Sequence, residues 1–111
     1  MKFSEYVRYD GIGLAELVRN KQVQTHELLE LAILRAEKVN PKLNAIVIPL
    51  YEQARKNSQK TTSGKFSGVP FLLKDLHQEL AGAPTSFGSK SFKKAHYIST
   101  DTSGIVKRWI N

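Results

Sequence analysis

The hydrophobic and polar positions of the first 40 residues predict two helices. The segment 13–20 (GLAELVRN) follows an Asp-Gly turn and has the apolar spacing of a short helix. A longer helix is predicted from Thr25, a good N-cap residue, to about Val39, where Asn40-Pro41 is a stop signal. Its apolar residues cover more than one stripe, so we expect it to pack on two sides or to be buried in an assembly.

Residues 41–76 predict a strand, a helix and a second strand. The first strand lies in NAIVIPL, residues 44–50, which is rich in β-branched residues. A polar helix and then a loop fill residues 51–68, and VPFLLK follows at 69–74. This last run shows no polar–apolar alternation, which is typical of a strand buried on both faces in a parallel sheet. Two strands separated by a helix form a βαβ unit, which is right-handed by default.

The remainder of the chain predicts loops and one more helix. A run rich in Gly, Ser, Thr and Pro follows Lys74, and a last helix, TSGIVKRWI, is predicted with Thr100 or Asp101 as its cap. The sequence thus predicts an α/β fold in which two N-terminal helices precede a βαβ unit. We expect a single domain, 1–111, made of a helical part (1–40), the βαβ unit (41–76) and a loop with the terminal helix (77–111).

Composition and charge narrow the choice of partners. The formal net charge is +7, and the basic excess lies beyond residue 40. These cations are scattered and few aromatic residues lie among them, so a solvated surface is favoured over a nucleic-acid interface. The absence of cysteine excludes disulfides and thiolate metal sites. The sequence has neither a signal-peptide core nor an apolar run of about 18 residues, so we expect a cytoplasmic protein without membrane contact.

The sequence contains residues typical of metal sites and of Ser-His-Asp triads, but not at the required spacing. The histidines His26, His77 and His96 lack metal-ligand spacing, so no metal site is expected. A triad of Ser86 or Ser89 with His77 and Asp75 satisfies no spacing rule and is disfavoured.

Lys74 is the strongest single candidate for chemistry. It stands at the C-terminal end of the second predicted strand, where α/β folds place their sites. Burial would lower its pKa, and a shift of about three units would leave a neutral amine that can act as a general base. The alternative is a surface lysine that pairs with Asp75, and spacing alone favours that alternative.

Three ordered motifs change this balance. GVPFLLKDL, AGAPTSFGSKSF and DTSGIVKR resemble the amidase signature family. Lys74 matches the catalytic lysine of that family, and Asp101-Thr102 matches the start of a family helix. The upstream residues 14–47 also look like the family's opening helices and first strand. The matching loop residues are Thr85, Ser86, Gly88 and Ser89.

The resemblance implies an α/β/α mixed-sheet fold and a serine–cis-serine–lysine amide hydrolase. In such an enzyme a serine attacks the amide carbonyl, and the lysine takes its proton through a bridging serine. Backbone amides form the oxyanion hole, no metal or organic cofactor is needed, and the substrate is a small-molecule amide. Leu76, after Lys-Asp, resembles the general acyl amidases rather than the tRNA-dependent amidotransferases, whose amidase-type chain tends to carry Asn there.

The glycine- and serine-rich segment that holds the family's catalytic serines is absent from these 111 residues. We therefore expect an N-terminal fragment of an amidase that is inactive alone. Its second predicted strand would be an open apolar edge, so we also expect self-association. The alternatives are a fragment of the amidase-type chain of a tRNA-dependent amidotransferase and a non-catalytic binding or oligomerising module.

Overall fold

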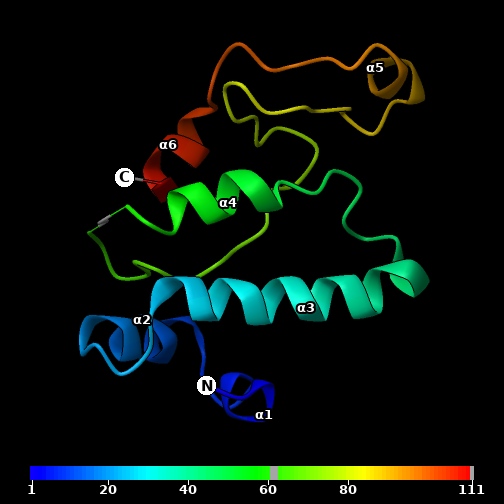
Figure 1. Cartoon of the computed structure of the whole chain (residues 1–111). Helices are drawn as coiled ribbons and strands as arrows, with labels where there is room; N and C mark the ends of the chain where they lie inside the picture. Colours follow the sequence, from blue (N-terminus) through cyan, green and yellow to red (C-terminus); the bar gives the residue numbers. More distant parts are fainter. Residues whose placement is uncertain (61–62, 111) are drawn as a thin grey trace. The chain divides into compact units, whose positions relative to one another are not determined.

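The computed structural model describes residues 1–60 and 63–110, and its secondary structure is helical (Figure 1). The chain divides into two compact units, Met1–Ile46 with Tyr51–Phe71 and Val47–Leu50 with Leu72–Asn111. The predicted loop at Thr61-Thr62 and the last residue, Asn111, lie outside the described residues. The helices are α1 (Phe3–Tyr6), α2 (Gly11–Arg19), α3 (Thr25–Leu43), α4 (Tyr51–Asn57), α5 (Lys90–Lys94) and α6 (Gly104–Ile110).

The two predicted N-terminal helices are present as α2 and α3. Helix α2 begins at Gly11 because the Asp10 carboxylate accepts a hydrogen bond from the Gly13 amide at 2.8 Å, which caps the first turn. Helix α3 begins at the predicted Thr25, but Gln24 is its N-cap residue, and the Gln24 amide donates to Glu27 at 2.8 Å. The sequence pattern thus located both helices to within two residues at their starts.

The predicted stop of α3 at Asn40-Pro41 is wrong. Pro41 lies inside the helix, which continues to Leu43 and ends where Asn44 adopts a left-handed conformation (φ 48°). The Asn44 amide donates to the carbonyl oxygen of Asn40 at 2.7 Å. A proline in the last turn removes one amide donor with few residues left to disrupt, and asparagine tolerates the left-handed cap that ends the helix.

A small apolar core holds the first unit together. Leu14, Val23 and Leu28 are buried, and Leu28 is fully inaccessible. Helix α3 also buries Leu29 and Ile33, whereas Leu34 is 61% exposed, so not every apolar side of this helix is covered. The partly buried side chains that pack against the core are those of Tyr6, Leu17, Val18 and Val69.

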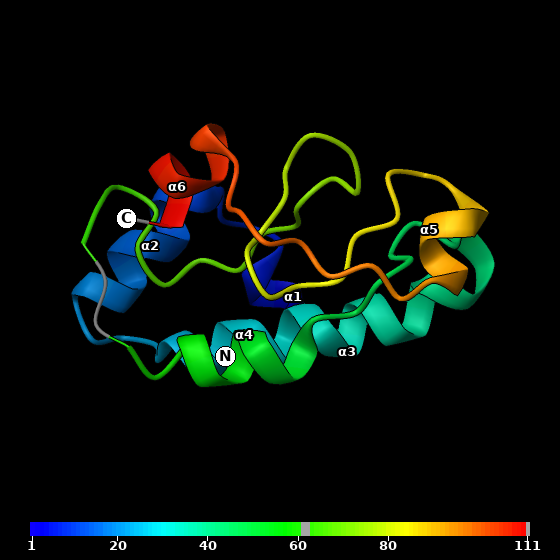
Figure 2. The same ribbon diagram turned by 90° about the horizontal axis from the view of Figure 1, so that it is seen from above.

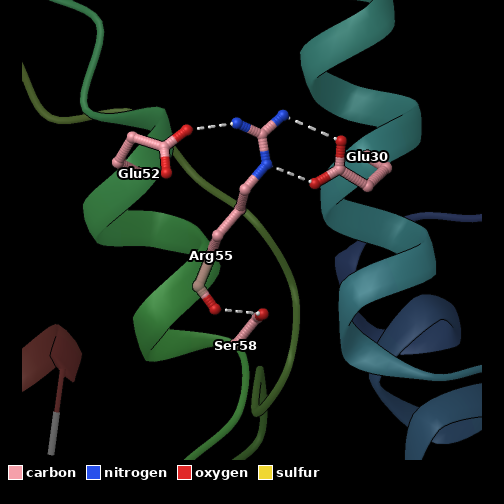
Figure 3. Close-up of polar contacts among 4 residues, drawn as sticks. All are labelled: Glu30, Glu52, Arg55 and Ser58. Carbon is pink, nitrogen blue, oxygen red and sulfur yellow. Dashed lines mark hydrogen bonds and ion pairs between the residues drawn. The ribbon is translucent and has the colours of Figure 1, made fainter.

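Helix α4 lies beside α3 (Figure 2), and Arg55 joins the two helices. Its Nε and Nη2 atoms donate to the two carboxylate oxygens of Glu30 at 2.7 and 3.0 Å, which is the bidentate geometry that suits a guanidinium (Figure 3). Nη1 donates to Glu52 at 2.7 Å within α4, and Ser58 Oγ donates to the Arg55 carbonyl at 2.8 Å. The polar helix predicted after residue 50 is therefore confirmed, as a shorter element.

The two predicted strands, and with them the βαβ unit at 41–76, are wrong for the described residues, which form no named strand. The Asn40 side chain both donates to the Ile46 carbonyl at 2.9 Å and accepts from the Ile46 amide at 2.8 Å, so a side chain replaces the strand partner there. In the second segment Phe71 is 54% and Leu72 is 71% exposed, which contradicts burial on both faces. A strand needs a neighbouring strand for its amides and carbonyls, and the described residues form no ladder with either of these two segments.

In the second unit, residues 79–85 and 97–103 pair in opposite directions. The Gly82 amide donates to the Ser99 carbonyl at 2.9 Å, and the Ser99 amide donates to the Ala83 carbonyl at 3.0 Å. Pro84 and Ile98 form an isolated antiparallel bridge, and Pro84 has no amide with which to extend it. The pairing is thus a short two-segment tie rather than a sheet.

The prediction that Thr100 or Asp101 caps the last helix is also wrong. Helix α6 begins at Gly104, and the Ser103 carbonyl accepts from the Lys107 amide at 3.0 Å. Thr102 Oγ1 instead accepts from the Ala81 amide at 3.0 Å, and the Ser103 amide donates to the Glu79 carbonyl at 3.0 Å. Thr102 and Ser103 thus bond to residues 79–81, and the helix begins after them.

Candidate functional site

Lys74, the principal candidate, lies on a loop of the second unit with its side chain exposed. Its predicted burial is therefore wrong in this chain. Its backbone amide donates to Gln78 Oε1 at 2.7 Å, which fixes the chain direction just before Asp75. Within the described part of the chain, the ion pairs include neither Lys74 nor Asp75, so the alternative of a Lys74–Asp75 pair is not formed either.

Asp75 gathers the Thr85-Ser86 segment around its carboxylate. Oδ1 accepts from Thr85 Oγ1 and from the Ser86 amide, both at 2.8 Å, and Oδ2 accepts from Ser86 Oγ. Thr85 and Ser86 are buried, with 8% and 6% of their surface exposed. Donors from residues ten and eleven positions away thus satisfy the carboxylate, and the two site motifs are brought together.

The same hydrogen bonds set the proton affinity of Asp75. Burial alone would raise the pKa of this carboxyl. Hydrogen bonds from the Ser86 hydroxyl and amide, from the Thr85 hydroxyl and from the Gly88 amide outweigh burial and hold the pKa below its usual value. Asp75 is therefore an anion at neutral pH, and it acts as an acceptor.

The loop after Ser86 turns sharply. Phe87 and Gly88 both have positive φ, 50° and 72°, and the Ser89 amide donates to the Ser86 carbonyl at 2.7 Å. Glycine adopts this conformation freely, whereas a left-handed Phe87 costs about 1–2 kcal/mol. The Phe87 ring packs against Phe92 and Tyr97, with centroids 5.3 and 5.9 Å apart, and this contact offsets the cost.

The predicted site residues differ in their burial and in their contacts. Thr85 and Ser86 are buried on Asp75, Gly88 is exposed at the turn, and Ser89 is the N-cap residue of α5. From the sequence, Asp75 was considered only as an ion-pair partner of Lys74 and as a member of the disfavoured triad, and its contacts with Thr85 and Ser86 were not predicted. The signal that could have found these contacts is an aspartate just after the candidate lysine, followed ten residues later by adjacent hydroxyl residues.

The disfavoured internal triad is not assembled. Asp75 Oδ2 accepts directly from Ser86 Oγ, which leaves no place for an imidazole between them. Among the described residues, no group of three or more His, Asp or Glu side chains is arranged to hold a metal ion. None of the helices of the described segments is long and apolar enough to cross a membrane.

Residues 27–111 match the protein family described as Amidase. This match covers more than half of the chain, so the chain belongs to the amidase family, and the resemblance of its three motifs to the amidase signature is confirmed. The family assignment fits the geometry, because the Lys-Asp motif and the Thr-Ser motif meet in the second unit.

Three relatives support the same family. The chain is 40% identical over 99 residues to the 6-aminohexanoate-cyclic-dimer hydrolase of Pseudomonas sp. (strain NK87), covering 89% of this chain and 20% of the relative. It is 40% identical over 83 residues to the putative amidase AmiC of Mycobacterium leprae, covering 75% of this chain and 18% of the relative. An acylamidase of Rhodococcus erythropolis is 33% identical over 103 residues, covering 86% of this chain and 21% of the relative. The chain thus spans about a fifth of the length of these three relatives.

A solved structure shows the same fold. The structure of 6-aminohexanoate cyclic dimer hydrolase complexed with substrate superposes with a TM-score of 0.85 at 39% identity, covering 92% of this chain and 21% of that chain. The predicted membership of the amidase fold is therefore confirmed for this portion, although the strands expected within it are absent from the described residues.

Proposed function

We propose that this chain supplies the lysine-bearing part of an amidase active site. The observation that carries the proposal is the 0.85 TM-score match to a hydrolase solved with its substrate. The motif contacts support it, since Asp75 ties the candidate lysine's neighbour to Thr85 and Ser86. The proposed reaction is hydrolysis of an amide to a carboxylate and an amine or ammonia.

In this proposal Lys74 is the base. Its amine takes the proton of a serine nucleophile through a bridging serine, and it later returns a proton to the leaving amine. The 111 residues hold no glycine- and serine-rich segment of the family type. The 111-residue polypeptide by itself is therefore proposed not to hydrolyse amides.

The substrate class is a small-molecule amide. The matched relatives carry the names of a cyclic-dimer hydrolase, an acylamidase and a lipoamidase, which favours a hydrolase over an amidotransferase. Leu76 after the Lys-Asp pair points the same way. The proposed mechanism uses serine and lysine side chains alone and calls for no metal or organic cofactor.

A hybrid enzyme tests the role of Lys74. This chain replaces the matching fifth of the Pseudomonas hydrolase, and hydrolysis of the 6-aminohexanoate cyclic dimer is followed. Lys74→Ala is expected to lower kcat/KM by a factor of about 10²–10⁴, because general-base catalysis is lost. Lys65→Ala, which removes another exposed lysine, is the matched control and should leave activity unchanged.

Two outcomes would contradict the proposal. One is an active hybrid in which Lys74→Ala keeps full activity. The other is labelling of a serine in the isolated 111-residue chain by a fluorophosphonate, which would reveal an internal nucleophile that the proposal excludes.

A non-catalytic oligomerising module is the second candidate, favoured by the apolar side chains left open in the second unit. Leu72, Ile98 and Ile105 are 71%, 47% and 47% exposed. Exposed apolar surface of this kind favours association with a second copy. Analytical ultracentrifugation at micromolar concentration tests it, and a clean monomer with a cooperative melt would count against self-association.

A further inference from the structure

Asp75 has no role in the reaction proposed above, yet its carboxylate organises the loop that follows. It accepts from Thr85 Oγ1, from the Ser86 amide and from Ser86 Oγ. Both donor residues are more than nine-tenths buried. A carboxylate with these contacts is a fixed point of the second unit rather than a solvated surface charge.

The chemistry of the contacts is specific to an anion. In the described part of the chain no cation pairs with Asp75, so hydrogen-bond donors alone balance its charge. Both carboxylate oxygens are used as acceptors: Oδ1 accepts from the Thr85 hydroxyl and the Ser86 amide, and Oδ2 accepts from the Ser86 hydroxyl. An amide side chain at this position would offer one acceptor oxygen only, so asparagine can reproduce only part of the arrangement.

Asp75 is joined by a peptide bond to Lys74, and the backbone is held on both sides of that bond. The Lys74 amide donates to Gln78 Oε1 at 2.7 Å, and the Asp75 side chain is held by the 85–86 segment. The Lys74 side chain itself is exposed. These contacts therefore fix the backbone of Lys74 and leave its side chain in solvent.

We propose that Asp75 is a positioning residue, which ties the Lys74-Asp75 backbone to residues 85–88 and so sets where the lysine amine is presented. The proposal deepens, and rests on, the proposed role of Lys74 as the base. Asp75 acts through Lys74 and takes up no proton in the reaction. Its contribution is to hold a reacting group in place, which a loose backbone cannot do.

The anchor is tested by NMR on the 111-residue chain. Asp75→Ala is expected to speed hydrogen exchange of the Ser86 amide by about tenfold or more, because a charge-assisted hydrogen bond is lost. It should also change the amide–α-proton coupling of Lys74, which reports the backbone angle φ. Asp75→Asn keeps one acceptor and should rescue part of both effects. Asp101→Asn, at an exposed aspartate of the same unit, should change neither.

Unchanged Ser86 exchange and unchanged Lys74 coupling in Asp75→Ala would overturn the proposal. A uniform loss of protection along the chain with an unchanged Lys74 coupling would overturn it too, because that is the result of a merely structural role. If the alanine variant does not fold, Asp75→Asn and Thr85→Val carry the test, and wild-type coupling in both variants would overturn the proposal.

The hybrid enzyme separates this proposal from the one on which it rests. Asp75→Ala is expected to lower kcat by a factor of about 10–10² with KM little changed, as misplacement of a reacting group does. Full activity of Lys74→Ala would overturn the proposed base, whatever the NMR result. Loss of activity in Lys74→Ala together with full activity in Asp75→Ala would overturn the positioning role alone.

Discussion

Each of the two units of the chain is stabilised internally by a different kind of contact. The first unit has a core of Leu14, Val23 and Leu28, contributed by α2, α3 and the turn between them. The second unit has helices of five and seven residues and depends on the Asp75 carboxylate and on pairing between residues 79–85 and 97–103. Apolar burial therefore organises one part of the chain, whereas long-range polar contacts hold the candidate site residues together in the other.

The largest expected effect is in the apolar core of the first unit. Leu28 is fully inaccessible, so Leu28→Ala should cost about 2–5 kcal/mol of unfolding free energy through lost burial and the cavity left behind. The measurement is urea unfolding followed by helical circular dichroism. Leu34→Ala, on the same helix but at a side chain 61% exposed, should cost less than about 0.5 kcal/mol. Equal costs for the two variants would contradict the view that buried apolar side chains hold the first unit together.

The helices could be predicted from the sequence because their signals are local. Asp10 before a Gly-rich start and Thr25 before an apolar run lie within a few residues of the helices that they announce. The end of α3 was predicted too early, because Pro41 is a stop signal in the middle of a helix but is tolerated in its last turn. The short α1 and α5 gave no periodic signal of their own.

The strands could not be predicted correctly because strand formation depends on distant partners. The 69–74 segment has the composition of a buried strand, and the family resemblance supported that interpretation. Composition does not supply the neighbouring edge, and without one Leu72 is left 71% exposed. The burial expected for Lys74 depended on the same missing neighbour.

The candidate site was predicted in part. The motif residues Lys74, Thr85, Ser86, Gly88 and Ser89 came from the family resemblance, and the family is confirmed. The hydrogen bonds of Asp75 were missed because their donors lie ten and eleven residues away and no periodicity marks such a contact. The catalytic role of Lys74 stays a prediction.

Two glycines with positive φ differ in how closely their surroundings are packed. Gly68, in the first unit, has φ +82°, and an added Cβ would lie 2.8 Å from Thr25 Oγ1 and 2.9 Å from Val18 Cγ1. Gly88, in the second unit, has φ +72° and no atom within 4 Å of such a Cβ.

Gly88→Ala should therefore cost only the backbone strain, about 1 kcal/mol, whereas Gly68→Ala adds a clash in the packed unit and should cost about 2–3 kcal/mol. Thermal melts of the two variants beside the wild type measure the difference. A larger cost for Gly88→Ala would show that the second unit is the more tightly packed one.

Acid should affect the loop around Asp75 in a definite range of pH. The pKa of Asp75 lies below the ordinary value of 3.8. Burial acts to raise this pKa, but the hydrogen bonds from Ser86 and Thr85 lower it by more than burial raises it. A carboxyl with a lowered folded-state pKa contributes stability that is present above its unfolded value and is lost as the pH falls through the folded value. The Ser86 amide shift should therefore titrate with a midpoint below 3.8. Asp75→Asn should abolish this step, and a midpoint above 3.8 would contradict the hydrogen-bonded carboxylate.

The smallest expected effect is at Arg55, where the first unit does use charge. Its pair with Glu30 is bidentate but about 40% exposed on both sides, so we expect Arg55→Lys to lower the unfolding free energy less than any of the core and glycine variants above. The cost should shrink when the salt concentration is raised from about 0.05 M to about 1 M, because the Debye length falls to about 3 Å. Glu52→Gln is the matched control. Because Glu52 is 82% exposed and binds Arg55 within α4 alone, this variant should lower the unfolding free energy less than Arg55→Lys does. A salt-independent loss for Arg55→Lys as large as that of Leu28→Ala would mean that a polar contact, rather than the apolar core, fixes α4 beside α3.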